Sequence, residues 1–183
     1  MAKPETDDSR SEEETKTGGG IAANAFANYV PISNEVVTPQ VFICPADKAK
    51  TKNIASDFTD RAGTGFLHNQ FQNNALSYIV GLDAVFTLPE TILTGDRNIR
   101  TSGNKQCGTV HVPSSALYGD DTNIGWTNGI HRFQGHLGLS DGSVQTTTSG
   151  GLLDFAKNSL DSGPRPGVPS NDIIIPALPT VIP

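Results

Sequence analysis

Short stretches that mix apolar and β-favouring residues lie between turn residues along the chain, and they predict β-strands. Residues 40–44 (QVFIC), 75–82 (ALSYIVGL) and 90–96 (ETILTGD) are three of them. A fourth, 172–176 (DIIIP), follows a Gly- and Pro-containing break in the pattern, and we expect it to form an edge strand. Strands this short, separated by turns, are typical of a small antiparallel sheet.

The segment 136–147 (HLGLSDGSVQTT) carries the clearest local pattern. Leu137 and Leu139 alternate with other residues before Asp141-Gly142, and the alternation resumes at Val144. Asp-Gly between alternating apolar positions predicts a β-hairpin, and we expect a type I′ turn, in which both central residues have positive φ.

Helical spacing appears at two places. In 151–160 (GLLDFAKNSL) the apolar residues can share one face, which predicts a short amphipathic helix. Residues 21–30 (IAANAFANYV) predict a helix stub that ends before Pro31. The order of helix, strands, hairpin, helix and strand predicts an α+β fold built on an antiparallel sheet.

Composition divides the chain into three parts. Residues 1–20 are acidic and polar and end in three glycines, so we expect them to be disordered because they cannot bury enough apolar surface. Residues 21–176 hold the apolar patterns and form the expected globular domain, and 177–183 form a Pro-rich tail. The net charge of -6, without a cluster of Lys and Arg, argues against a nucleic-acid partner. The apolar runs are too short to span a bilayer.

The chain has two cysteines, Cys44 and Cys107, which are too far apart in sequence for a zinc site with local Cys-x-x-Cys spacing. Two alternatives stay open from the residues alone. The cysteines either pair as a disulfide in an oxidising compartment or remain separate buried thiols.

Histidines and acidic residues suggest a metal site. His131 and His136, with Asp120, Asp121 and Asp141, hold the ligand types of a metal-dependent hydrolase. However, His131 and His136 lie five residues apart on the approach to a strand, where odd spacing sends side chains to opposite faces. We therefore expect no metal ion between them.

Two further groups of residues are candidates for binding. Asp120, Asp121 and Asn123 offer hard oxygen ligands for calcium, although they lack the spacing of a twelve-residue calcium loop. The aromatic residues Tyr118, Trp126 and Phe133 could line a sugar-binding surface, but such residues more often cover a small core.

The segment Gly95-Asp96-Arg97-Asn98 looks catalytic because of its charged residues. We expect instead an Asp–Arg pair or a turn in which an Asx side chain closes a strand.

Five ordered segments of the chain resemble the bacterial pilin-like proteins of type II secretion systems, the pseudopilins. The last segment contains His131, then nine residues, then Asp141-Gly142, which matches the His-x9-Asp-Gly element near the C-terminus of these proteins. The segments are FICPAD at 42–47, SYIVGLDA at 77–84, ILTGDRNI at 92–99, GW at 125–126 and HRFQGHLGLSDGSV at 131–144.

The resemblance implies a pilin-like head: a small antiparallel sheet, a short N-terminal helix stub and one C-terminal helix. It implies a structural subunit without catalytic residues that packs with other pilin-like subunits or secretion-system components at the periplasm or cell surface. Family members begin with a leader and a long apolar helix that anchors them in the inner membrane, and 1–20 does not match that helix. We therefore expect this chain not to insert into a membrane, and to be a monomer or weak dimer in solution.

The implied extracytoplasmic location favours a Cys44–Cys107 disulfide. His131 and Asp141-Gly142 are expected to act structurally, by bracing opposite ends of one strand. Two alternatives to the filament function remain: a secreted module that binds a glycan or surface polymer, and a metal-dependent hydrolase.

Overall fold

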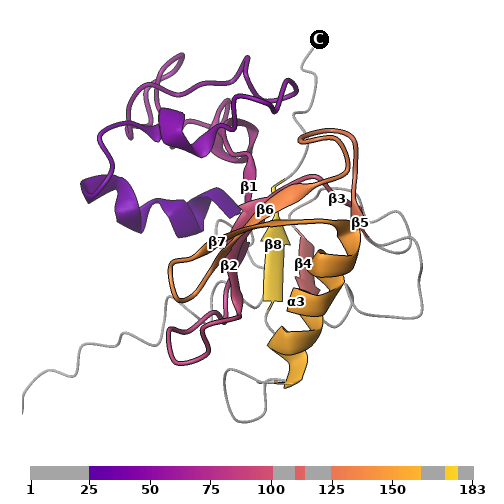
Figure 1. Cartoon of the computed structure of the whole chain (residues 1–183). Coiled ribbons are helices and arrows are strands. Elements are labelled where there is room, and N and C mark those ends of the chain that lie inside the picture. Colours follow the sequence, from indigo (N-terminus) through magenta and orange to yellow (C-terminus); the bar gives the residue numbers. More distant parts are fainter. Residues whose placement is uncertain (1–24, 101–109, 114–124, 162–171, 177–183) are drawn as a thin grey trace, which may run out of the picture.

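Antiparallel strands form the centre of the protein, as the computed structural model shows for residues 25–100, 110–113, 125–161 and 172–176 (Figure 1). Six strands pair in the order β4-β8-β1-β2-β6-β7, and every pairing is antiparallel. They are β1 (Tyr78–Gly81), β2 (Ile92–Asp96), β4 (Val110–Pro113), β6 (Gly135–Leu139), β7 (Val144–Thr147) and β8 (Asp172–Ile175). A second, two-stranded sheet pairs β3 (Ile99–Arg100) with β5 (Gly125–Trp126). The predicted α+β class is confirmed.

The two faces of the large sheet are covered differently. The α-helix α3 (Ser149–Asp161) packs on one face, and its Leu152 and Ala156 join a core with strand residues Ile79, Leu137 and Ile173. On the other face lies the chain before β1, which is built largely of turns (Figure 1). Its 3-10 helices are η2 (Ala25–Tyr29), η3 (Pro31–Asn34), η4 (Pro39–Phe42) and η5 (Gln72–Ala75).

An aromatic cluster forms the core on this second face. Phe42 and Phe66 lie with their ring centroids 5.3 Å apart, and Phe26 meets Phe66 edge to face at 6.1 Å. Tyr78 and Val80 of β1 pack against the same cluster, whereas Ile79 between them belongs to the core under α3. The strand predicted in 75–82 therefore alternates between two cores, and both of its faces are covered.

Four predicted elements are confirmed. The strands expected at 75–82 and 90–96 contain β1 and β2, the hairpin of 136–147 is β6 and β7, and the helix of 151–160 is α3. Leu137 and Leu139 are buried, as their alternation predicted.

The strand predicted at 40–44 is wrong, since the segment begins as the 3-10 helix η4. Thr38 caps this turn by accepting a hydrogen bond from the Gln40 backbone N–H, and Pro39 fits its first position. Phe42 and Ile43 are buried by packing on the aromatic cluster, not by pairing with a strand. Their apolar run therefore resembled a buried strand without being one.

Two further predictions need correction. The strand at 172–176 forms as β8, but it lies between β4 and β1 and not at an edge, because Val110–Pro113 pairs with its outer side. The helix stub expected at 21–30 appears as the 3-10 helix η2 in its described part. The segments 1–20 and 177–183 lie outside the described residues.

The β6–β7 turn has one left-handed residue, not the two of a type I′ turn. Gly142 has φ +84°, whereas Asp141 is not among the residues with positive φ. Gly142 donates its N–H to the Leu139 carbonyl, and the Leu139 N–H bonds to the Ser143 carbonyl. This is the pattern of a three-residue loop with a type I turn followed by a left-handed glycine.

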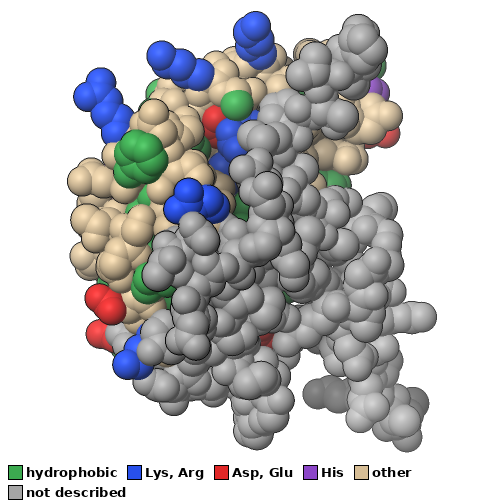
Figure 2. Space-filling model, turned by 90° about the vertical axis from the view of Figure 1, so that its right-hand side faces the viewer, with side chains coloured by type: hydrophobic (Ala, Val, Ile, Leu, Met, Phe, Trp, Pro, Cys, Tyr) green, Lys and Arg blue, Asp and Glu red, His purple; other side chains and the backbone are tan. Residues whose placement is uncertain are grey.

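The surface of the described part mixes residue types. Figure 2 shows Lys and Arg side chains standing apart from one another on the face turned to the viewer. Large hydrophobic side chains also reach solvent at separate places in the chain, among them Val37, Phe86, Phe133 and Val144. No helix in the described ranges has the length and apolar character that crossing a bilayer requires.

Candidate functional site

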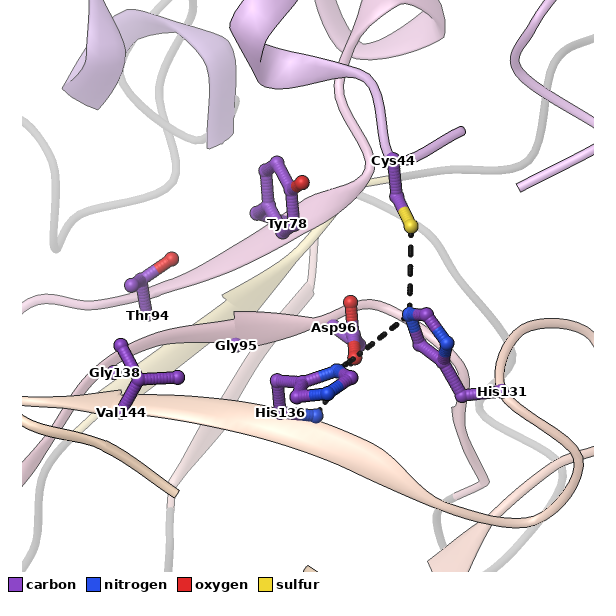
Figure 3. A pocket seen from close by; sticks show the side chains of 9 residues that line it. All are labelled: Cys44, Tyr78, Thr94, Gly95, Asp96, His131, His136, Gly138 and Val144. Atoms are coloured by element: carbon purple, nitrogen blue, oxygen red, sulfur yellow. Dashed lines mark hydrogen bonds and ion pairs between the residues drawn. The ribbon is translucent and has the colours of Figure 1, made fainter. Parts of the chain in front are cut away.

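Cys44, Asp96, His131 and His136 meet at a pocket beside the sheet (Figure 3). The cavity has a volume of about 270 Å³. Strand residues complete its wall, namely Tyr78, Thr94, Gly95, Gly138 and Val144.

The polar atoms of the cluster lie close together. His131 Nε2 is 3.4 Å from Cys44 Sγ and 3.6 Å from Asp96 Oδ2. The same carboxylate oxygen accepts a hydrogen bond from the His136 backbone N–H at 2.7 Å, and His136 Nδ1 lies 3.0 Å from it. Ligand atoms of Cys44, Asp96 and His131 all fall within 4.8 Å of one another.

Neighbouring strands place two of these residues. β2 pairs with β6 so that Gly95 lies opposite Leu137. Asp96 and His136 are the next two residues that lie opposite each other on these strands. Both line the pocket, whereas Leu137 points to the core under α3. Sheet register therefore fixes the contact between Asp96 and His136.

A left-handed turn places His131. His131, Arg132 and Phe133 have φ values of 43°, 50° and 63°, a conformation that L-residues other than glycine rarely adopt in succession. In Figure 3 the His131 ring points from this turn toward Cys44 and Asp96. Such backbone outliers persist where their surroundings hold them, and they concentrate at functional sites.

Asn98 holds the turn. Its Nδ2 donates to the carbonyls of Thr127, Ile130 and Gln134 at 2.9, 3.1 and 3.2 Å. These carbonyls flank the left-handed residues on both sides, and Asn98 is itself buried. The loop that carries His131 is therefore tied to the residue that lies two positions after Asp96.

The prediction that His131 and His136 point to opposite faces is wrong. Their ring centroids are 4.5 Å apart, with the ring planes at 85°. The rule of alternation applies within a strand, but β6 begins only at Gly135, and the left-handed turn before it reverses the direction of His131.

Burial and neighbouring carboxylates shift the pKa values of two groups that line the pocket. Desolvation by burial raises the pKa of the Cys44 thiol, and the charges of Asp96 and Asp47 raise it further. Burial also raises the pKa of Tyr78 to about 12, with contributions from Cys44, Asp96 and Asp47. Both shifts favour the neutral forms of the thiol and the phenol.

Asp96 and Arg97 do not form the predicted pair. Arg97 instead donates from Nε and Nη2 to the two carboxylate oxygens of Asp47, each at 2.6 Å. Ser77 Oγ donates to Asp47 Oδ2 at 2.9 Å. Because neighbouring residues at a strand end point in opposite directions, Asp96 reaches the histidines while Arg97 reaches Asp47.

The other predicted site residues do not join this cluster. Asp141 lies in the exposed hairpin turn, where Oδ1 accepts the Ser143 backbone N–H at 2.8 Å. His131 and Asp141 thus lie at opposite ends of β6, as expected. Trp126 is 4% exposed and belongs to the core, whereas Phe133 is 62% exposed. The calcium candidates Asp120, Asp121 and Asn123, and also Tyr118, lie outside the described residues.

The predicted Cys44–Cys107 disulfide is not present. Cys44 is a buried free thiol whose sulfur faces His131 Nε2. Cys107 lies outside the described residues.

Sequence reasoning missed Cys44 and Asp96 as members of the site. Both residues lie inside the segments 42–47 and 92–99, which carry the resemblance to pilin-like proteins. The usable clue was that His131, Asp96 and Cys44 each belong to a different segment of that resemblance.

Comparison of the chain with protein-family models, with curated proteins and with solved structures finds no significant match.

Proposed function

We propose that this chain is the extracytoplasmic head of a pilin-like filament subunit, which acts by packing with other subunits. The observation that carries the proposal is the convergence of the segments behind the resemblance. Segments 42–47, 77–84, 92–99 and 131–144, far apart in sequence, meet through their polar residues.

Several of these contacts join chain segments through side chains that are used in hydrogen bonds. Asp47, Ser77 and Arg97 are all buried, and each uses its polar atoms on another member of the trio. The Asn98 amide donates its hydrogen bonds to carbonyls of the loop before β6. Motif residues used in this way maintain a fold, which favours a structural protein over an enzyme.

The remaining segment of the resemblance, 125–126, also uses its side chain in contacts inside the fold. Trp126 Nε1 donates to Thr147 Oγ1 at 3.1 Å, and a Cβ at Gly135 would lie 2.5 Å from the Trp126 ring. Gly135 therefore permits β6 to lie against the indole. This use of Trp126 disfavours the glycan-binding alternative, which would need the ring at the surface.

The architecture supports the proposal as well. The resemblance implies a head with a small antiparallel sheet and one C-terminal helix, and the antiparallel sheet with α3 on one face agrees with that expectation. Exposed Val37, Phe86, Phe133 and Val144 supply apolar contact area for neighbouring subunits.

Fractionation of cells that make this chain tests the proposal. Surface filaments are sheared off, pelleted and analysed by mass spectrometry, with an outer-surface protein that does not polymerise as the control. We expect peptides of the chain to be enriched in the filament pellet relative to that control. Recovery of the chain only in the soluble or polysaccharide-bound fraction would reject the filament function.

A further inference from the structure

We propose that Cys44, Asp96 and His131 form a binding site for a divalent transition-metal ion of the zinc type. Cys44 follows η4, Asp96 ends β2, and His131 lies in the loop before β6. Their ligand atoms all lie within 4.8 Å of one another (Figure 3). The proposal goes beyond the filament function and does not depend on it.

The two separations that involve His131 Nε2 fit tetrahedral coordination, and a Cys44 and an Asp96 ligand atom lie within 4.8 Å of each other. Zinc binds thiolate sulfur at about 2.3 Å and histidine nitrogen or carboxylate oxygen at about 2.0–2.2 Å, so tetrahedral angles place these donor atoms roughly 3.3–3.6 Å apart. His131 Nε2 lies 3.4 Å from Cys44 Sγ and 3.6 Å from Asp96 Oδ2. An ion can therefore sit among the three with small adjustments.

Hydrogen bonding alone does not explain why His131 Nε2 lies close to both Cys44 and Asp96. His131 Nε2 carries at most one hydrogen, yet it faces both the Cys44 sulfur and the Asp96 carboxylate at similar distances. A separation of 3.6 Å is beyond the range of a good hydrogen bond. One hydrogen on Nε2 can therefore account for the contact with Cys44 but not also for the approach to Asp96, whereas a metal ion would be bound by all three ligand atoms.

Neighbouring groups hold the ligands in place. His136 donates its backbone N–H to the Asp96 carboxylate and places Nδ1 3.0 Å from it, so it orients that ligand. Asn98 fixes the left-handed turn that directs His131 inward. His136 and Asn98 are thus positioning residues for the site.

The ligand types select the class of metal. Thiolate and imidazole favour zinc and similar borderline ions, whereas calcium and magnesium prefer six or more oxygens. Three protein ligands leave a fourth position, and the three residues line the same cavity as Tyr78, Thr94 and Val144. Water can fill that position.

Cobalt(II) is the probe of choice because its bond to a thiolate gives a charge-transfer absorption band. The full chain, reduced and freed of metal with a chelator, is titrated with cobalt(II) chloride and then with zinc chloride. We expect saturable binding of one cobalt ion per chain, a thiolate-to-cobalt band, and loss of that band as zinc displaces cobalt. Calcium chloride in place of zinc should leave the band unchanged.

Matched variants locate the site. Cys44→Ser should abolish the band, whereas Cys107→Ser should keep it. His131→Gln should weaken binding by more than about 100-fold, and His136→Gln by roughly 10- to 100-fold, as expected for a residue that orients a ligand. His68→Gln, at a position outside the pocket lining, should bind cobalt as the unchanged protein does.

Folding of each variant is checked by far-UV circular dichroism, and Asp96→Asn provides a second ligand variant if Cys44→Ser does not fold. Zinc should also raise the melting temperature of the unchanged protein but not that of Asp96→Asn. The proposal is overturned if the unchanged protein shows no saturable binding. It is equally overturned if the band survives Cys44→Ser or depends on Cys107.

Discussion

Arg97 and Asp47 form a two-pronged ion pair in the interior, with both hydrogen bonds at 2.6 Å and side chains that are 6% and 0% exposed. The pair joins the end of β2 to the chain after η4. Removal of one partner leaves the other charge buried without compensation. We expect Arg97→Met to lower the free energy of unfolding by about 3–5 kcal/mol, measured by urea denaturation.

The double variant Asp47→Asn/Arg97→Met should recover part of this loss, because it removes the buried charge. Arg61→Met, at an exposed position, should stay within roughly 0.5 kcal/mol of the unchanged protein. An Arg97→Met protein as stable as the Arg61→Met control would contradict a structural role for the pair.

Gly142 should tolerate few substitutions. With φ at +84° and nothing within 4 Å of an added Cβ, the cost of a side chain arises from the backbone and not from crowding. We expect Gly142→Val to lose about 2 kcal/mol of stability in urea denaturation, and Gly142→Asn to lose less, because asparagine adopts the left-handed region more readily. Equal losses for the two variants would argue against this explanation.

Asn98 should matter more than its neutral side chain suggests. Asn98→Asp replaces an amide whose two hydrogens are shared among three carbonyls with a carboxylate that repels them, so we expect a loss of about 2 kcal/mol, near 1 kcal/mol for each N–H group. Asn74→Asp is the control, because Asn74 Nδ2 donates to one exposed carbonyl, that of Gln70. Urea denaturation of both variants gives the comparison, and similar losses would contradict the role assigned to Asn98.

The sequence predicted those elements whose pattern is local. β1 and β2 follow from short runs of apolar and β-favouring residues, the β6–β7 hairpin from alternation around Asp-Gly, and α3 from helical spacing. The segment 40–44 could not be assigned in this way, because burial against the aromatic cluster makes Phe42 and Ile43 resemble a strand. The central place of β8 depends on its pairing with the distant Val110–Pro113.

The candidate site was less predictable because it also depends on contacts between residues that are far apart in the sequence. Sheet register brings Asp96 to His136, and a turn of three left-handed residues brings His131 to both. That turn contains no glycine, so the sequence carries no local sign of it. Asn98, which helps to hold the turn in place, lies 29 to 36 residues away from its three acceptors.

Alkaline pH should destabilise the protein through Tyr78. Its folded-state pKa of about 12 lies above the ordinary value of 10.0, so the native state favours the neutral phenol. Its contribution is therefore fully present below pH 10.0 and is lost as the pH rises through about 12. Urea denaturation at a series of pH values should show this decline, and Tyr78→Phe should reduce it. An unchanged decline in Tyr78→Phe would assign the effect to other groups.

Electron cryomicroscopy of filaments sheared from cells that make this chain tests the proposed function most directly. We predict a repeating subunit whose density holds the antiparallel sheet in the order β4-β8-β1-β2-β6-β7, with α3 on one face. Well-resolved filaments whose subunits cannot accommodate this sheet, in cells where the chain is present only as a free protein, would contradict the account.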